Sequence, residues 1–102
     1  MVSYPTLTVQ RRLADKVFVL EVIRDLDEAI ALLCAQLGDT VDPFAEDLCP
    51  YFGILWPAAE ALASHLADNP ELVQGRDVLE LGCGLGFPAM VASHLGGRVL
   101  AT

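Results

Sequence analysis

Basic residues are scarce in this sequence. Lysine and arginine together number 6, against 14 aspartates and glutamates, which gives a formal net charge of −8 and a pI near 4.4. Proteins that bind nucleic acid neutralise phosphates with basic patches, so this balance argues against nucleic acid as a partner. A neutral or basic substrate is easier to accommodate.

Long apolar segments are also missing. Hydrophobic residues make up 54% of the chain, but no apolar run reaches the length of about 18 residues that a membrane span needs. The first residues do not combine a basic segment with an apolar core, so a secretory signal is not indicated either. We therefore predict no membrane association and a cytoplasmic location.

Cysteine and histidine patterns typical of disulfide frameworks or metal sites are absent. Cys34, Cys49 and Cys83 are odd in number and lack C-x-x-C spacing, which favours free thiols in a reducing compartment. His65 and His94 each stand without a second ligand at metal-binding spacing, so we predict no metal site. Cys34, within an apolar helical pattern, is expected to be a core thiol.

One stretch, residues 77–88, organises the rest of the chain. It begins with a short apolar run typical of a buried strand, continues through Gly82, Gly84 and Gly86, and reaches Pro88, which suits a first helical turn. Three closely spaced glycines allow positive φ and let a ligand approach the backbone directly. We expect strand, glycine turn and helix, with a second strand over residues 98–102.

The spacing of this turn distinguishes between ligands. A dinucleotide fold uses G-x-G-x-x-G, whereas here the third glycine comes one residue early and Phe87 occupies the dinucleotide position. The carboxylate of Glu80, at the end of the expected strand, would oppose a phosphate but favour a cationic ligand.

The preceding segments are predicted from their periodicity. Residues 7–13 and 16–23 are β-branched, partly alternating runs that predict a hairpin. Asp25 and Glu28 form a D-x-x-E capping box before a helix that ends at Gly38 and is expected to pack on the hairpin. Residues 39–50 read as a linker, and a second helix is expected from Pro57 to about residue 68.

Aromatic residues gather just before that second helix, in P-Y-F-G-I-L-W-P at residues 50–57. Composition alone favours filling of the core by Tyr51, Phe52 and Trp56. Together with G-R-D-V-L-E-L-G-C-G-L-G-F-P at residues 75–88, however, this segment resembles the class I (seven-β-strand) S-adenosylmethionine (AdoMet) methyltransferases, in the branch of protein-lysine and nicotinamide N-methyltransferase-like proteins.

The resemblance implies a fold, a cofactor and a set of cofactor-binding residues. The fold would be α/β and Rossmann-like, with residues 1–41 forming a hairpin and helix extension and residues 42–102 starting the AdoMet-binding domain. The methyl acceptor would be a nitrogen of a protein or small molecule, and no catalytic residue can be named. The residues expected to bind AdoMet are Trp56, Glu80, Gly82, Cys83, Gly84 and Gly86.

Two expected βα strands are few for a doubly wound sheet, so we expect this sequence to be the N-terminal part of a methyltransferase. If instead it were complete, its uncovered sheet would favour a homodimer. Two alternatives remain open from the residues themselves. One is a fragment of an NAD-type dinucleotide-binding oxidoreductase, and the other is a non-catalytic interaction module in which the glycine turn is only structural.

Overall fold

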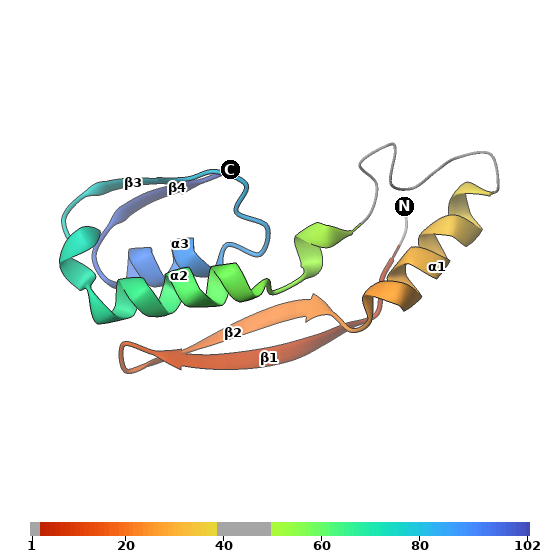
Figure 1. Ribbon diagram of the computed structural model, residues 1–102, viewed down its shortest axis with the longest axis horizontal. Helices are drawn as coiled ribbons and strands as arrows, with labels where there is room; N and C mark the ends of the chain where they lie inside the picture. Colours follow the sequence, from red (N-terminus) through yellow and green to blue (C-terminus); the bar gives the residue numbers. More distant parts are fainter. Residues whose placement is uncertain (1–2, 39–49) are drawn as a thin grey trace.

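The computed structural model describes residues 3–38 and 50–102 and is a mixed α/β structure, as predicted (Figure 1). An antiparallel hairpin comes first, and a parallel strand pair joined through a helix comes last. In chain order the elements are β1 Thr6–Leu13, β2 Lys16–Ile23, α1 Leu26–Leu37, the 3₁₀ turn η1 Tyr51–Gly53, α2 Pro57–Asp68, the 3₁₀ turn η2 Pro70–Leu72, β3 Asp77–Glu80, α3 Phe87–His94 and β4 Arg98–Ala101.

The predicted hairpin is confirmed, with Leu13 opposite Lys16 in the register. Its two turn residues, Ala14 and Asp15, adopt positive φ of 51° and 61°, as the hairpin turn that matches strand twist requires. Neither is glycine, so the turn lacks the usual sequence signal. The alternating burial along β2 instead fixes the register, because a slip by one residue would expose its apolar face.

The core lies between the hairpin and two helices. Phe18, Leu20 and Val22 of β2 pack against Ala63 of α2 and against Phe87 and Val91 of α3. The rings of Phe18 and Phe87 meet edge to face, with centroids 5.7 Å apart, a favourable aromatic geometry. Figure 1 shows the hairpin running beneath α2 along much of its length. The hairpin therefore closes one side of the helical layer.

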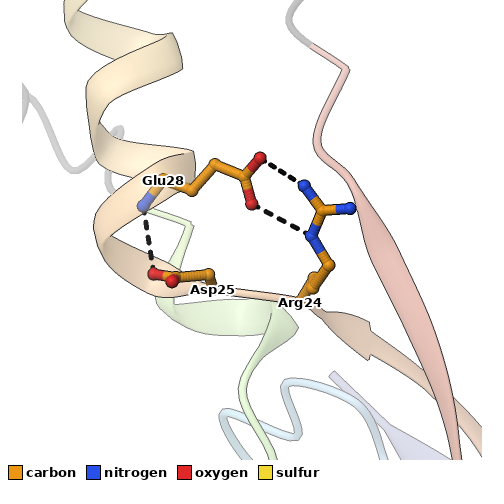
Figure 2. A network of polar contacts seen from close by, with 3 residues as sticks. All are labelled: Arg24, Asp25 and Glu28. Carbon is orange, nitrogen blue, oxygen red and sulfur yellow. Dashed lines mark hydrogen bonds and ion pairs between the residues drawn. The ribbon is translucent and has the colours of Figure 1, made fainter.

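Helix α1 begins at the predicted cap (Figure 2). The Asp25 carboxylate accepts a hydrogen bond from the Glu28 backbone N–H at 3.1 Å, and Gly38 ends the helix with φ 78°. Only this half of the capping box forms as expected, because the Glu28 carboxylate accepts hydrogen bonds from the Arg24 guanidinium. The one-sided cap still satisfies an N–H that the helix leaves unpaired.

Two predictions about α1 are wrong. The helix extends past the end of the hairpin, where Figure 1 shows it pointing away from the strands. The inner face of β2 is already covered by α2 and α3, so α1 has no apolar strand surface left there. Cys34 is exposed rather than a core thiol. Ala29 and Leu33 occupy the buried face of the helix instead.

The parallel pair forms as predicted, with Asp77 opposite Arg98 and Glu80 opposite Ala101. Helix α3 connects the two strands and packs on α2. Both strands end at the glycine turn, where the Thr102 N–H donates to the Glu80 carbonyl at 2.9 Å. The turn therefore lies at the carboxyl edge of the sheet, where α/β folds place their ligands.

Some predictions fall outside the described residues. The linker at residues 39–50 lies almost wholly there, as do Cys49 and the expected boundary between residues 41 and 42. Within residues 3–38 and 50–102, no helix has the length and apolar character needed to cross a membrane.

Candidate functional site

The glycine turn between β3 and α3 has the backbone geometry expected of a ligand seat. Gly82, Gly84 and Gly86 adopt φ of 62°, 52° and 76°, in the left-handed region that side chains disfavour. The Cys83 N–H donates to the Thr102 carbonyl at 2.9 Å, and the Gly86 N–H donates to the Cys83 carbonyl at 2.8 Å. These bonds hold the turn against β4 and start α3 directly after it.

A pocket of about 560 Å³ opens over this turn. The structure brings all the residues predicted to bind a cofactor to its lining: Trp56, Glu80, Gly82, Cys83, Gly84 and Gly86. They come from the segment before α2, from the end of β3 and from the turn itself. A side chain built on Gly82 or Gly86 would meet nothing within 4 Å. The space next to the backbone of these two glycines is therefore free for a ligand.

Glu80 is the charged residue in the lining of this pocket. Its Oε1 atom is buried and has no hydrogen-bond partner among the described residues. Burial raises the pKa of Glu80, while a hydrogen bond from the backbone of Ala89 acts in the opposite direction. A desolvated carboxylate with an unused acceptor favours a cationic hydrogen-bond donor, such as an ammonium group.

The aromatic segment forms one wall of the pocket. Trp56 is 45% exposed and Phe52 63% exposed, so the interpretation of these residues as core filling is wrong. The Trp56 Nε1–H donates to the Tyr51 carbonyl at 3.2 Å, and the two rings lie 5.9 Å apart. The wall is thus built from η1 and the residue that precedes α2.

Four further residues line the pocket that were not predicted from the sequence: Tyr51, Phe52, Ile54 and Leu62. The available signal was the helical phase of Leu62, which lies three and four residues after Ala59 and Ala58 and so shares the pocket-lining face of α2 with them. Cys83 is half-buried, with its Sγ 3.8 Å from the Gly84 carbonyl. A thiol of this size fits between two glycines of the turn.

The histidines lie outside this pocket. His94 Nε2 is 3.3 Å from the Ala14 carbonyl, and its ring contacts Phe18. His65 lies beside Asn69 at the end of α2. Within the described residues, no group of three or more histidines, cysteines or acids is placed to hold a metal ion.

Comparison with known proteins supports the resemblance inferred from the sequence. The electron transfer flavoprotein beta subunit lysine methyltransferases of Homo sapiens and Danio rerio are 47% and 52% identical over 53 and 48 residues, or 51% and 47% of this chain. The protein N-terminal and lysine N-methyltransferase EFM7 of Eremothecium gossypii is 49% identical over 55 residues, or 52% of this chain. No family model matches.

The matched segments make up 20%, 18% and 21% of those three relatives, so this chain spans about a fifth of their length. The resemblance predicted from the glycine turn and the aromatic segment is nevertheless confirmed, and at two levels. The fold is mixed α/β with a glycine turn at the carboxyl edge of a parallel pair. Over about half of its length, this chain is homologous to protein-lysine methyltransferases.

Proposed function

We propose that this chain carries the cofactor-binding pocket of an AdoMet-dependent methyltransferase that modifies lysine side chains of a protein. The observation that carries the proposal is the meeting of Glu80, the three-glycine turn and Trp56 around one pocket. The names of the homologous proteins support lysine as the acceptor. The net charge of −8 also suits a basic acceptor. A reducing compartment such as the cytoplasm suits the free thiols.

The described residues fit AdoMet in three ways. The turn from Gly82 to Gly86 exposes backbone at its three glycines, and the methionine part of AdoMet can lie directly against it. The Glu80 carboxylate lines the pocket and can accept a hydrogen bond from its ammonium group. The ring of Trp56 adds an aromatic surface to the lining of the same pocket.

When bound, AdoMet supplies a methyl group attached to a cationic sulfur. The task left to this chain is to bind and orient, because transfer of an activated methyl group depends mainly on alignment of donor and acceptor. Glu80 and the glycine turn would fix one end of the pocket, and the aromatic wall would exclude water along its side.

Titration calorimetry with AdoMet, S-adenosylhomocysteine and NAD⁺ tests the proposal. We expect saturable binding of the first two and none of NAD⁺. Phe87, at the position where a dinucleotide turn needs glycine, is only 1% exposed and part of the core, which supports this expectation. Selective binding of NAD⁺ would replace the proposal with an oxidoreductase fragment. Absence of heat with all three ligands would favour a non-catalytic module.

A matched pair of variants tests the role of Glu80. Glu80→Gln keeps the shape of the side chain but removes its charge, and we expect AdoMet binding to weaken by about tenfold or more, the usual scale for losing one charge-assisted hydrogen bond. Asp77→Asn removes an acid from the same strand, where Asp77 pairs with Arg98 on the surface. Equal affinities for AdoMet in the two variants would rule out a direct contact with Glu80.

The methyl acceptor is tested with AdoMet that carries a labelled methyl group. The electron transfer flavoprotein β subunit is the first candidate, since the animal relatives are named for it. We expect label on lysine, and a substrate whose lysines are replaced by arginine is the control. Label on another residue type would contradict the proposed acceptor.

A further inference from the structure

The end of the hairpin contacts the aromatic wall of the pocket, and the Ile23 side chain leaves no room for a side chain at Gly53. A Cβ atom built on Gly53, the last residue of η1, would lie 2.4 Å from Cδ1 and 2.5 Å from Cγ1 of Ile23, the last residue of β2. Gly53 is buried and Ile23 is only 8% exposed. The φ of Gly53 is outside the left-handed region, so the need for glycine comes from this contact rather than from backbone strain.

The η1 segment also lies beside the glycine turn. A Cβ atom built on Gly84 would lie 3.6 Å from the Phe52 carbonyl oxygen. Phe52 also lines the pocket, together with Tyr51 and Trp56. The short η1 segment therefore lies close to both the hairpin and the glycine turn of the proposed cofactor site.

Hydrogen bonds link the residues of η1 to one another and to Trp56. The Gly53 N–H donates to the Pro50 carbonyl at 3.1 Å, and the Ile54 N–H donates to the Tyr51 carbonyl at 3.2 Å. The same Tyr51 carbonyl accepts the indole N–H of Trp56. A displacement at Gly53 would thus shift the Tyr51 carbonyl and, through it, the Trp56 ring.

We infer that Ile23 and Gly53 are positioning residues that set the distance between the aromatic wall and the glycine turn. This inference rests on the proposed function for its link to AdoMet, but the contact itself does not depend on any ligand. The hairpin, which has no residue in the lining of the pocket, would in this way control the width of the pocket.

The test begins with Gly53→Ala. We expect η1 to shift, AdoMet binding to weaken by about tenfold or more because a small misplacement is costly in a preorganised site, and acrylamide quenching of Trp56 fluorescence to change. Trp56 is the only tryptophan in the sequence, so the signal is unambiguous. Gly97→Ala is the matched control. Its Cβ would also be crowded, 3.1 Å from the Ala92 carbonyl oxygen, although less closely than the Cβ built on Gly53, and Gly97 does not line the pocket.

Shortening the opposing side chain completes the test. In Ile23→Ala/Gly53→Ala the new methyl group gains the space that Ile23 leaves, so quenching of Trp56 and AdoMet affinity should return toward the original values. Ile23→Ala alone should loosen η1 and increase quenching of Trp56. If Gly53→Ala does not fold, Trp56 quenching and AdoMet affinity in Ile23→Ala and in the double variant test the inference instead.

Several outcomes would overturn the inference. Unchanged Trp56 quenching in Gly53→Ala would mean that Ile23 rotates away at no cost to η1. Equal changes in Gly53→Ala and Gly97→Ala would mean that both report general destabilisation. A double variant no closer to the original protein than Gly53→Ala would remove Ile23 from the explanation. If the unaltered protein binds no AdoMet, the proposed function fails, whereas Trp56 quenching still judges the Ile23–Gly53 contact.

Discussion

The two sides of the α2–α3 helical layer differ in what they bury. On the hairpin side, Phe18 is 2% exposed and Leu20 4% exposed. On the side of the parallel pair, Val78 and Val99, which alternate with the exposed Leu79 and Leu100, are only half-buried. Figure 1 shows the hairpin and the parallel pair on opposite sides of the two helices. Burial of apolar surface is the main stabilising term in folding, so the hairpin side contributes more stability.

The parallel pair contributes the site instead. Its strands end at the glycine turn, and Glu80 keeps a buried oxygen without a partner there. Unpaired polar groups reduce stability and are typical of places where a ligand binds. The comparison therefore predicts that substitutions on the two sides have separable effects, on folding in one case and on ligand binding in the other.

The largest expected effect is on the hairpin side. Phe18→Ala removes a ring that packs against Phe87, and we expect the free energy of unfolding to fall by about 3–5 kcal/mol. Leu100→Ala, on the exposed strand pair, should stay within about 0.5 kcal/mol. Urea unfolding followed by circular dichroism measures both. Similar losses in the two variants would contradict the division between the sides.

A smaller effect on stability, but a larger one on binding, is expected at the turn. Gly84→Ala places a side chain at φ 52°, which costs about 1–2 kcal/mol, and it adds a methyl group to the lining of the pocket, 3.6 Å from the Phe52 carbonyl oxygen. Gly75→Ala places a side chain in the same left-handed region, at φ 71°, but its Cβ would have no neighbouring atom within 4 Å. Both variants should lose similar stability, while only Gly84→Ala should lose AdoMet binding. Equal binding by the two would argue against the turn as the seat.

The cap of α1 does not line the pocket and provides a local comparison. Asp25→Ala removes the acceptor for the Glu28 N–H and should cost about 1 kcal/mol. Asp25→Asn, which retains an acceptor oxygen, should preserve most of that stability. AdoMet affinity should not change in either variant, and a change would show that α1 is coupled to the pocket.

The smallest expected change in stability comes from Glu80→Gln. Burial raises the pKa of Glu80 in the folded state, so ionisation costs more there than in the unfolded chain. The stability that Glu80 contributes therefore declines as pH rises from the ordinary carboxyl pKa through the raised value. Glu80→Gln should remove this dependence and be equally or slightly more stable at neutral pH. Urea unfolding from about pH 4 to pH 7, which spans the ordinary carboxyl range, measures the difference.

AdoMet binding should depend on pH with the opposite sign. The ionised carboxylate attracts an ammonium group, so affinity should rise as pH rises through the raised pKa of Glu80. Glu80→Gln should show a flat profile over the same range. A flat profile in the unaltered protein would indicate that the carboxylate does not contact the ligand.

Local features were predictable from the sequence because their causes are local. The limits of α2 follow from Pro57 at its start and from Pro70 just after its end, and Gly86 precedes α3 because the chain needs positive φ there. That the six proposed site residues lie around one pocket was also predictable, since strand end, turn and helix start are contiguous and the aromatic segment added Trp56.

Features that depend on distant segments were not predictable in this way. Which surface the hairpin covers, the exposure of Cys34 and of the aromatic wall, and the crowding of Gly53 by Ile23 all arise from packing between elements. Periodicity fixes which face of a strand or helix is apolar, but it does not say which partner buries that face. The sequence by itself therefore determined the elements and the turn, and only the tertiary structure decided which elements meet around the pocket, because packing joins residues that are far apart along the chain.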